Sequence, residues 1–249
     1  MMADEVKKEV VIKIDNLYKS YGNHHVIKGL NLEVYKGEVF GFVGPNGAGK
    51  STTIDCMIGA KTFEDGNIYL NNFDISENPY YAKRSFGYTS SEPTTYEMMT
   101  GNEYLEFIGD VYEMEEEAYR ANLAFLIRKF DLKEADLTKK ISSYSHGMKQ
   151  KIALMASLLY NPDIWIMDEP TVGLDIMVYE TLKEMMVQFA KNNGTIFLTS
   201  HNIELIAKIC DRVALIKDGV VYEIIDLNKR PDARYQLPRM FLNLYKDER

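Results

Sequence analysis

The sequence is poor in the residues that mark disulfide frameworks and membrane spans. It has only two cysteines, Cys56 and Cys210, which lie far apart within apolar surroundings and are predicted to be reduced core residues. The longest apolar run, 152–160, is less than half of the ~20 residues that a transmembrane helix needs. The charged segment 1–10 carries no secretory signal pattern. We therefore expect a soluble, cytoplasmic protein whose membrane role, if any, comes through a partner.

Basic charge is also scarce. The chain has 29 Lys and Arg residues against 37 Asp and Glu residues, a net charge of −8. This balance argues against a broad basic face, so no nucleic-acid partner is expected. With 46% apolar residues among 249, the chain can bury a sizeable core, either as one large α/β domain or as a domain with an inserted subdomain.

The hydrophobic pattern predicts an α/β core that begins with antiparallel strands. Residues 10–18 and 30–35 alternate apolar and polar positions like half-buried strands, and 38–44 is a short apolar run that stops at glycine. Other predicted strands follow the Asp65-Gly66 turn or lie at 85–90, 163–169, 194–200 and 211–224, the last a hairpin through Asp218-Gly219. Helices predicted at 177–192 and 202–210 separate the later strands, which favours parallel connections.

Between these strands the pattern becomes helical from about residue 97 to 160, with apolar residues three and four positions apart. The acidic run Glu115–Glu117 suits the first turn of a helix. We therefore predict a single domain over 1–249. Its parts are a core of mostly parallel sheet (1–88 and 161–226), an inserted helical subdomain (89–160) and a polar tail of uncertain order (227–249).

The segment "GPNGAGKS", residues 44–51, fits the phosphate-binding loop pattern G-x-x-x-x-G-K-[ST]. It follows an apolar strand and opens a plausible helix, so its backbone amides can surround a phosphate chain at a helix N-terminus. Lys50 is expected to bind the β- and γ-phosphate oxygens and Ser51 a magnesium ion. The predicted nucleotide-binding residues here are Gly44, Asn46, Gly47, Ala48, Gly49, Lys50, Ser51 and Thr52.

Two further strands end in polar residues that suit phosphate chemistry. "DIWIMDEP", 163–170, delivers Asp168 and Glu169 at the carboxyl end of a buried strand, where ligands bind in open α/β sheets. Asp168 is expected to hold magnesium directly or through water, and Glu169 to polarise the attacking water. His201 closes another apolar strand and is predicted to sense the γ-phosphate. A solvated strand end and a structural histidine are the alternatives.

These motifs together resemble those of ATP-binding cassette (ABC) ATPases. "YG" at 21–22, "GPNGAGKST", "YSHGMKQK", "DIWIMDEPTVGLD" and "TSH" occur in that family's order and spacing, over roughly residues 10–225. The resemblance is strongest to ATPase subunits of exporters whose membrane subunits are separate polypeptides. It implies a P-loop NTPase fold, ATP and Mg²⁺ as ligands, and ATP hydrolysis as the activity, with Lys50, Glu169 and His201 as catalytic residues.

In this family two ATPase subunits pack head to tail, each ATP lying between the P-loop of one and the signature sequence of the other. The resemblance therefore implies that Ser145 and Gly147 contact the ATP of a second subunit in a homodimer or pseudo-dimer, and that Asp175 links the two half-sites. His146 fills a variable position of the signature and is read as incidental. Tyr21 resembles the aromatic residue that stacks on adenine, whereas Tyr18 is predicted to be a core residue.

One departure from the family lies at 90–93, "SSEP". A glutamine that couples magnesium and the γ-phosphate to the helical subdomain is usual there, and the matching position is Ser91, followed by Glu92. We favour a water-mediated magnesium contact at Ser91, with Glu92 on the surface towards the membrane partner. The alternative is a local shift that places Glu92 at the ion.

Three functions remain open from the sequence. The favoured one is the ATP-hydrolysing subunit of an exporter, held at the inner face of the cell membrane by an integral-membrane permease. The second is a soluble ABC ATPase acting on cytosolic complexes, and the third is a regulator that binds ATP without turning it over. The intact Lys50, Asp168, Glu169 and His201 argue against the third.

Overall fold

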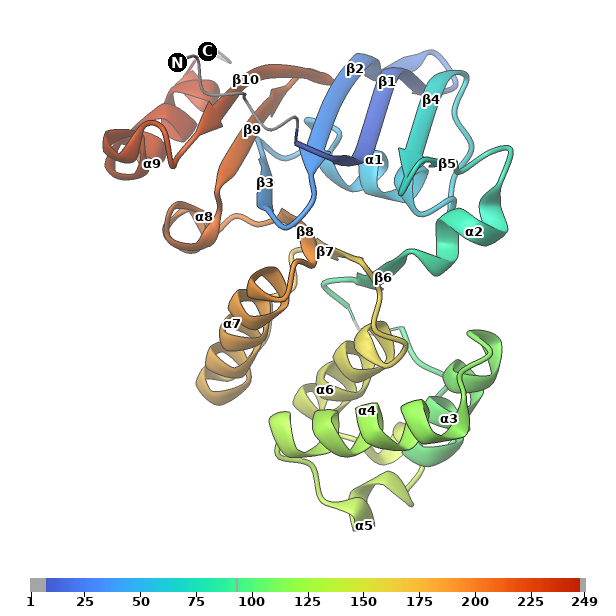
Figure 1. The fold of residues 1–249 in the computed structure, drawn as a ribbon. Coiled ribbons are helices and arrows are strands. Elements are labelled where there is room, and N and C mark those ends of the chain that lie inside the picture. The colour runs from blue at the N-terminus through green and yellow to red at the C-terminus, as the bar shows by residue number, and fades with distance from the viewer. Residues whose placement is uncertain (1–7, 93, 247–249) are drawn as a thin grey trace, which may run out of the picture.

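The computed structural model describes residues 8–92 and 94–246, which form two sheets above a lobe of helices (Figure 1). The first sheet is antiparallel, with strand order β2-β1-β4-β5. Its strands are β1 (Val10–Tyr21), β2 (His24–Tyr35), β4 (Asp65–Leu70) and β5 (Phe73–Asp74). The antiparallel region expected at the start of the chain is therefore present, with β2 beginning six residues before the predicted strand at 30–35.

The second sheet has strand order β10-β9-β3-β8-β7-β6 and is parallel except for β10. Its strands are β3 (Val39–Val43), β6 (Phe86–Thr89), β7 (Ile164–Asp168), β8 (Thr195–Thr199), β9 (Arg212–Lys217) and β10 (Val220–Asp226). β9 and β10 form the predicted hairpin, and Asp218 and Gly219 both have positive φ, 51° and 82°, as a two-residue turn requires. The mostly parallel α/β core is confirmed.

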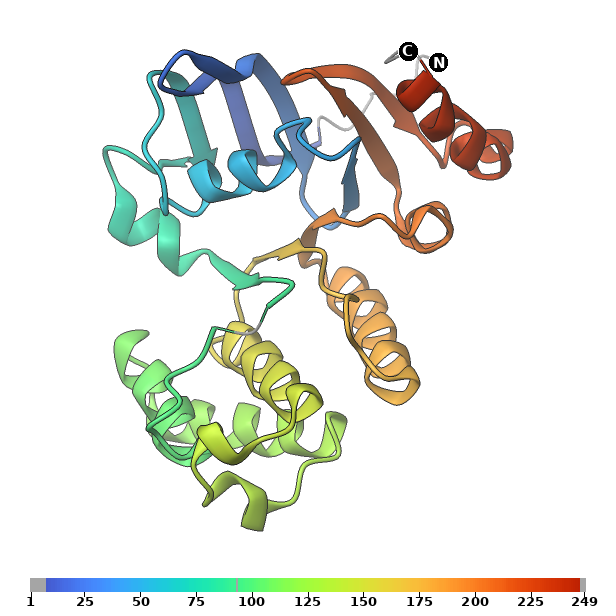
Figure 2. The same cartoon turned by 180° about the vertical axis from the view of Figure 1, so that it is seen from behind.

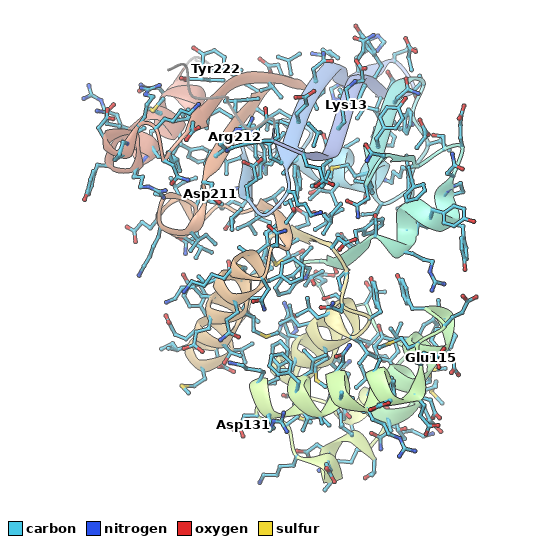
Figure 3. All side chains as sticks on the ribbon, viewed as in Figure 1. Lys13, Glu115, Asp131, Asp211, Arg212 and Tyr222 are labelled. Carbon is cyan, nitrogen blue, oxygen red and sulfur yellow. The ribbon has the colours of Figure 1, made fainter. Side chains whose placement is uncertain are left out.

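The helices divide between the core and the lobe (Figures 1 and 2). The lobe consists of α3 (Gly101–Val111), α4 (Glu116–Lys129), α5 (Glu134–Leu137), a short 3-10 turn (Ile141–Ser143) and α6 (His146–Leu158). The other helices are α1 (Lys50–Met57), α2 (Pro79–Arg84), α7 (Ile176–Lys191), α8 (Ile203–Ile209) and α9 (Pro231–Lys246). Glu115 precedes α4, as expected for the acidic helix start (Figure 3).

The lobe joins the core where α6 crosses β6. A Cβ atom at Gly87 would lie only 1.9 Å from the carbonyl oxygen of Ser157, so this close crossing requires glycine. A buried hydrogen-bond chain secures the crossing: the Trp165 indole donates to Thr89 Oγ1 (3.1 Å), and the Thr89 hydroxyl donates to Ser157 Oγ (3.0 Å). Sheet and lobe are therefore tied together by polar contacts as well as by packing.

The two sheets are tied together where β9 begins, because Arg212 Nη1 donates to the Glu33 carbonyl oxygen of β2 at 3.2 Å (Arg212 is labelled in Figure 3). Arg212 Nη1 lies 2.9 Å from Glu38 Oε1; the Glu38 side chain is buried and that of Arg212 is partly buried. Burial raises the pKa of the Glu38 carboxyl, while its hydrogen bond from the Tyr35 amide and the charge of Arg212 act in the opposite direction. Asp211 accepts a hydrogen bond from the Val39 amide (2.9 Å) and thereby aligns β3 with β9.

One expectation needs correction, and one open point is settled. Tyr18 is not a core residue, because 39% of its surface is exposed. The alternation that buries Ile12 and Ile14 would also bury Tyr18, but the pairing of β1 with β2 is irregular between Ile14 and Leu17. Burial therefore moves by one residue, so Leu17 is buried and Tyr18 points outward. The order of the tail, which the sequence left open, is that of a helix: α9 occupies most of it and buries Ala233, Leu237 and Phe241 at four-residue spacing. Residues 247–249 lie outside the described part of the chain.

Cys56 and Cys210 are both free and buried, as predicted. Across 8–92 and 94–246, the helices are too short or too polar to cross a membrane.

Candidate nucleotide site

The carboxyl ends of the parallel strands bring most of the predicted site residues to one edge of the sheet. β3, β8, β7 and β6 are neighbours and run in the same direction, so the segments that follow them start side by side. These segments begin with Gly44, Ser200, Glu169 and Ser90, respectively. Such an edge is where open α/β sheets bind ligands.

The segment 44–49 forms a tight loop between β3 and α1. A Cβ atom at Gly44 would lie 2.2 Å from the Ile216 carbonyl oxygen, so only glycine allows the loop to pass β9 this closely. Gly47 and Gly49 have φ values of 79° and 105°, which turn the chain into the helix. Unpaired amides at the start of α1 make this loop a phosphate-binding concavity.

Lys50 lies inside this loop, with 8% of its surface exposed. Its Nζ donates to the carbonyl oxygens of Gly44 (2.9 Å) and Pro45 (3.0 Å). Burial lowers the pKa of Lys50, and the nearby carboxylates of Glu169 and Asp168 oppose that shift. The Lys50 ammonium group thus donates to backbone carbonyl oxygens, and phosphate oxygens could accept these hydrogen bonds in their place.

Asp168 and Glu169 are held by a residue that the sequence interpretation missed. The Thr199 hydroxyl donates to Asp168 Oδ1 (2.5 Å) and accepts a hydrogen bond from the Glu169 amide (3.0 Å). In sequence, Thr199 is a β-branched residue in the apolar strand β8 and looks like an ordinary strand former. Thr199 is the first residue of the motif "TSH", but the role of its hydroxyl follows only from its pairing with Asp168 on the neighbouring strand.

His201 lies against Glu169. Its amide donates to Glu169 Oε2 (2.9 Å), and its ring Nε2 lies 3.2 Å from Glu169 Oε1, an ion-pair distance. That ring contact lacks hydrogen-bond geometry, and Glu169 Oε1 is buried without a hydrogen-bond partner among the described residues. Both carboxylate oxygens of Glu169 therefore lie against His201.

The donor set suits Mg²⁺. The predicted ligands, Ser51, Asp168 and Ser91, offer hydroxyl and carboxylate oxygens, which this hard cation prefers. Over 8–92 and 94–246, no group of three or more His, Cys, Asp or Glu side chains forms a metal cage. That is the usual situation for Mg²⁺, which takes one or two protein oxygens and fills its shell with phosphates and water.

Ser91 and Glu92 differ in exposure. Ser91 is half-buried, and its backbone carbonyl oxygen accepts from Gln150 Nε2 of α6 at 3.5 Å, whereas Glu92 is exposed. The magnesium role of Ser91 stays a prediction.

Tyr21 lies at the end of β1 with 43% of its surface exposed. Lys19 Nζ and Lys61 Nζ lie 5.2 Å and 5.1 Å from the centre of its ring. An exposed ring next to two cations fits a surface on which a base stacks.

The signature residues lie elsewhere, in the lobe (Figure 1). Ser145 caps α6 by accepting a hydrogen bond from the Met148 amide (3.3 Å). A Cβ atom at Gly147 would meet Asp175 Oδ2 at 3.6 Å, and one at Gly173 would meet His146 Nε2 at 2.9 Å. The signature and the loop of Asp175 are therefore neighbours within one chain, while the P-loop belongs to the core.

Comparison with known proteins decides the family. The model for "ABC transporter" matches residues 27–172, more than half of the chain, and an AAA domain model matches 140–207. The chain belongs to the ABC transporter family. The linearmycin resistance ATP-binding protein LnrL of Bacillus subtilis is 34% identical over 89% of this chain and 70% of its own length. As the family implies, the protein is an ABC ATPase.

Solved ABC cassettes have the same fold. A structure described as an ATP-binding subunit of an ABC transporter superposes with a TM-score of 0.87, at 30% identity, over 94% of this chain and 99% of its own. A dimeric bacterial ABC transporter cassette, MJ0796, has a TM-score of 0.77 at 25% identity, over 87% and 98% of the two chains. The predicted P-loop NTPase fold is confirmed.

Proposed function

We propose that this ABC ATPase drives an exporter through a separate integral-membrane permease, by ATP-dependent pairing of two cassettes. The observation that carries the proposal is the separation of two phosphate-reading motifs within one chain. The P-loop lies in the core, whereas Ser145 and Gly147 lie at the start of α6 in the lobe (Figure 2). Each motif forms half of a site, and a second cassette in head-to-tail orientation supplies the other half.

The pairing surface we propose includes an exposed apolar group next to the signature. Val172, Ile176 and Met177 have 53%, 80% and 76% of their surfaces exposed. They flank Asp175, whose Oδ1 caps α7 by accepting a hydrogen bond from the Val178 amide (2.9 Å). Burying such side chains against a second cassette is favourable, at about 25 cal/mol per Å² of apolar surface. A relative, MJ0796, is described as dimeric.

In a paired site we assign a separate role to each of the predicted residues. Lys50 and the loop amides bind the phosphates, Ser51 and Asp168 hold the magnesium ion, and Glu169 polarises the attacking water. His201 lies beside Glu169 and contacts the γ-phosphate. Ser145 and the amide of Gly147, contributed by the second cassette, complete the enclosure of that phosphate.

The permease is proposed to dock where the core meets the lobe. A cavity of about 200 Å³ lies there, and its lining includes the aromatic residues Tyr88, Tyr104 and Tyr112. Next to this lining, Tyr96 is exposed and contacts Tyr104 and Phe107, with ring centres 6.0 Å and 5.6 Å apart. Other exposed apolar side chains on α2 and α3 are Tyr80, Tyr81, Phe107 and Val111. An apolar surface of this kind marks a protein-interaction site. Docking here would place the ATPase at the inner face of the membrane.

Outward transport is proposed from two observations. The motifs "SHGMKQK" and "GLD" resemble those of export-type subunits. LnrL, similar over most of this chain, is named for resistance to linearmycin, an outcome that removal of a compound from the cell would produce.

We expect Phe107→Asp to abolish recovery of the permease when the tagged ATPase is purified from detergent-solubilised native membranes, because a charge would be buried in an apolar contact. ATP binding should be unchanged. Phe125→Asp is the matched control, because Phe125 is similarly exposed (42%, against 37% for Phe107) but lies on α4.

Two outcomes would contradict the proposal in different ways. If wild type and Phe107→Asp recover the same amount of permease, the permease does not dock on this surface. A wild-type protein that recovers only soluble partners would favour the function in cytosolic complexes.

A further inference from the structure

The Thr199 side chain is fully buried at the end of β8, and its hydroxyl contacts both acidic residues of the site. A hydroxyl has one proton to donate and lone pairs that accept. Here the proton goes to Asp168 Oδ1 (2.5 Å), and a lone pair accepts the Glu169 amide (3.0 Å). Buried hydroxyls need a partner, but a single backbone carbonyl would satisfy that need. The Thr199 hydroxyl instead bonds to two consecutive acidic residues, which is more than is needed to satisfy a buried hydroxyl group.

The bond to Asp168 fixes the direction of its carboxylate. With Oδ1 occupied by the Thr199 hydroxyl, the rotation of the carboxylate is restricted and Oδ2 remains for a cation. Thr199 pairs with Asp168 across the parallel strands β7 and β8, so the hydroxyl is held by the sheet itself. The donor is therefore as rigid as the strand that carries it.

The bond to Glu169 supports an unfavourable backbone conformation. Glu169 has φ of 51°, in the left-handed region that L residues other than Gly, Asn and Asp rarely adopt. Its amide bonds both the carbonyl oxygen of Thr199 (3.2 Å) and the Thr199 hydroxyl. This backbone turns the Glu169 side chain towards His201, two residues after Thr199. The end of β8 thus sets the direction of both acidic side chains.

We propose that Thr199 is a positioning residue that holds the metal-binding Asp168 and the water-polarising Glu169 in one fixed arrangement. The proposal rests on the roles given above to those two acids. It differs from a general packing role, because removing the hydroxyl without changing side-chain volume should affect magnesium use and turnover more than folding.

The test uses Thr199→Val, which keeps the shape and removes both hydrogen bonds, and Thr199→Ser, which restores the hydroxyl. Thr195→Val is the matched control, because Thr195 is also buried on β8, at the opposite end, where its hydroxyl accepts from the Gly37 amide (2.9 Å). ADP binding is measured by calorimetry with magnesium and with EDTA, alongside kcat and thermal unfolding. Asp168→Asn is measured in parallel.

We expect Thr199→Val to lower both kcat and the magnesium-dependent gain in ADP affinity by about 10-fold, the range for residues that orient metal ligands. ADP binding in EDTA should not change, Thr199→Ser should remain close to wild type, and Thr195→Val should keep both quantities. If Thr199→Val does not fold, Thr199→Ala takes its place, since the smaller side chain cannot clash.

Two results would overturn the inference, and they are distinguishable. In the first, Asp168→Asn loses the magnesium-dependent gain in ADP affinity, while Thr199→Val and Thr199→Ala keep both that gain and kcat. Thr199 is then a buried residue with a structural role only. If Asp168→Asn itself keeps the gain, the metal role of Asp168 is wrong, and the positioning role fails with it.

Discussion

Glu169→Gln is expected to lose most ATP turnover while retaining ATP binding. The amide keeps the size of the side chain but cannot polarise the attacking water, and general-base catalysis contributes about 10²–10⁴-fold. Because the paired state is consumed by hydrolysis, the variant should accumulate as an ATP-bound dimer.

Phosphate release measures the first effect, and light scattering with and without ATP measures the second as a doubling of mass. Glu204→Gln is the control, because Glu204 is an exposed carboxylate in the first turn of α8, three residues after His201. A Glu169→Gln protein that hydrolyses ATP at the wild-type rate would remove Glu169 from its assigned role.

Ser145→Arg is expected to abolish hydrolysis while each subunit still binds ATP. Ser145 is exposed at the N-terminus of α6, away from the P-loop of its own chain. A long side chain there blocks the facing half-site without touching the nucleotide loop. Ser143→Arg is the control, since Ser143 is also exposed and lies two residues earlier. Loss of ATP binding by Ser145→Arg alone would place the signature within the subunit's own site.

The sequence predicted those parts of the site in which one short pattern determines both conformation and chemistry. The P-loop is such a case, because the spacing of Gly44, Gly49 and Lys50 specifies the turn, the helix start and the cation together. Asp168, Glu169 and His201 could be placed because each follows an apolar strand. The parallel connections predicted between these strands then brought them to one edge.

The parts that were missed depend on pairing between distant segments. Thr199 acquires its role only from the register of β8 against β7, which no local pattern reports. Tyr18 lies outside because of the irregularity between Ile14 and Leu17, which the sequence pattern does not show. In α9 the apolar positions are spaced as in a helix, but Pro238 inside it is a helix-breaking signal. The role of Ser91 depends on the bound ligand and on the partner subunit, so it remains a prediction.

The composite site is tested most directly by mixing two inactive variants. Lys50→Ala removes the cation from the P-loop, and Ser145→Arg blocks the signature, so neither homodimer contains an intact site. In a mixed dimer, however, the intact P-loop of Ser145→Arg faces the intact signature of Lys50→Ala. Phosphate release by each variant alone should be at background, and the mixture should regain hydrolysis through that one site. A mixture that stays inactive although mixed dimers form, or a wild type that hydrolyses ATP as a strict monomer, would contradict the shared site.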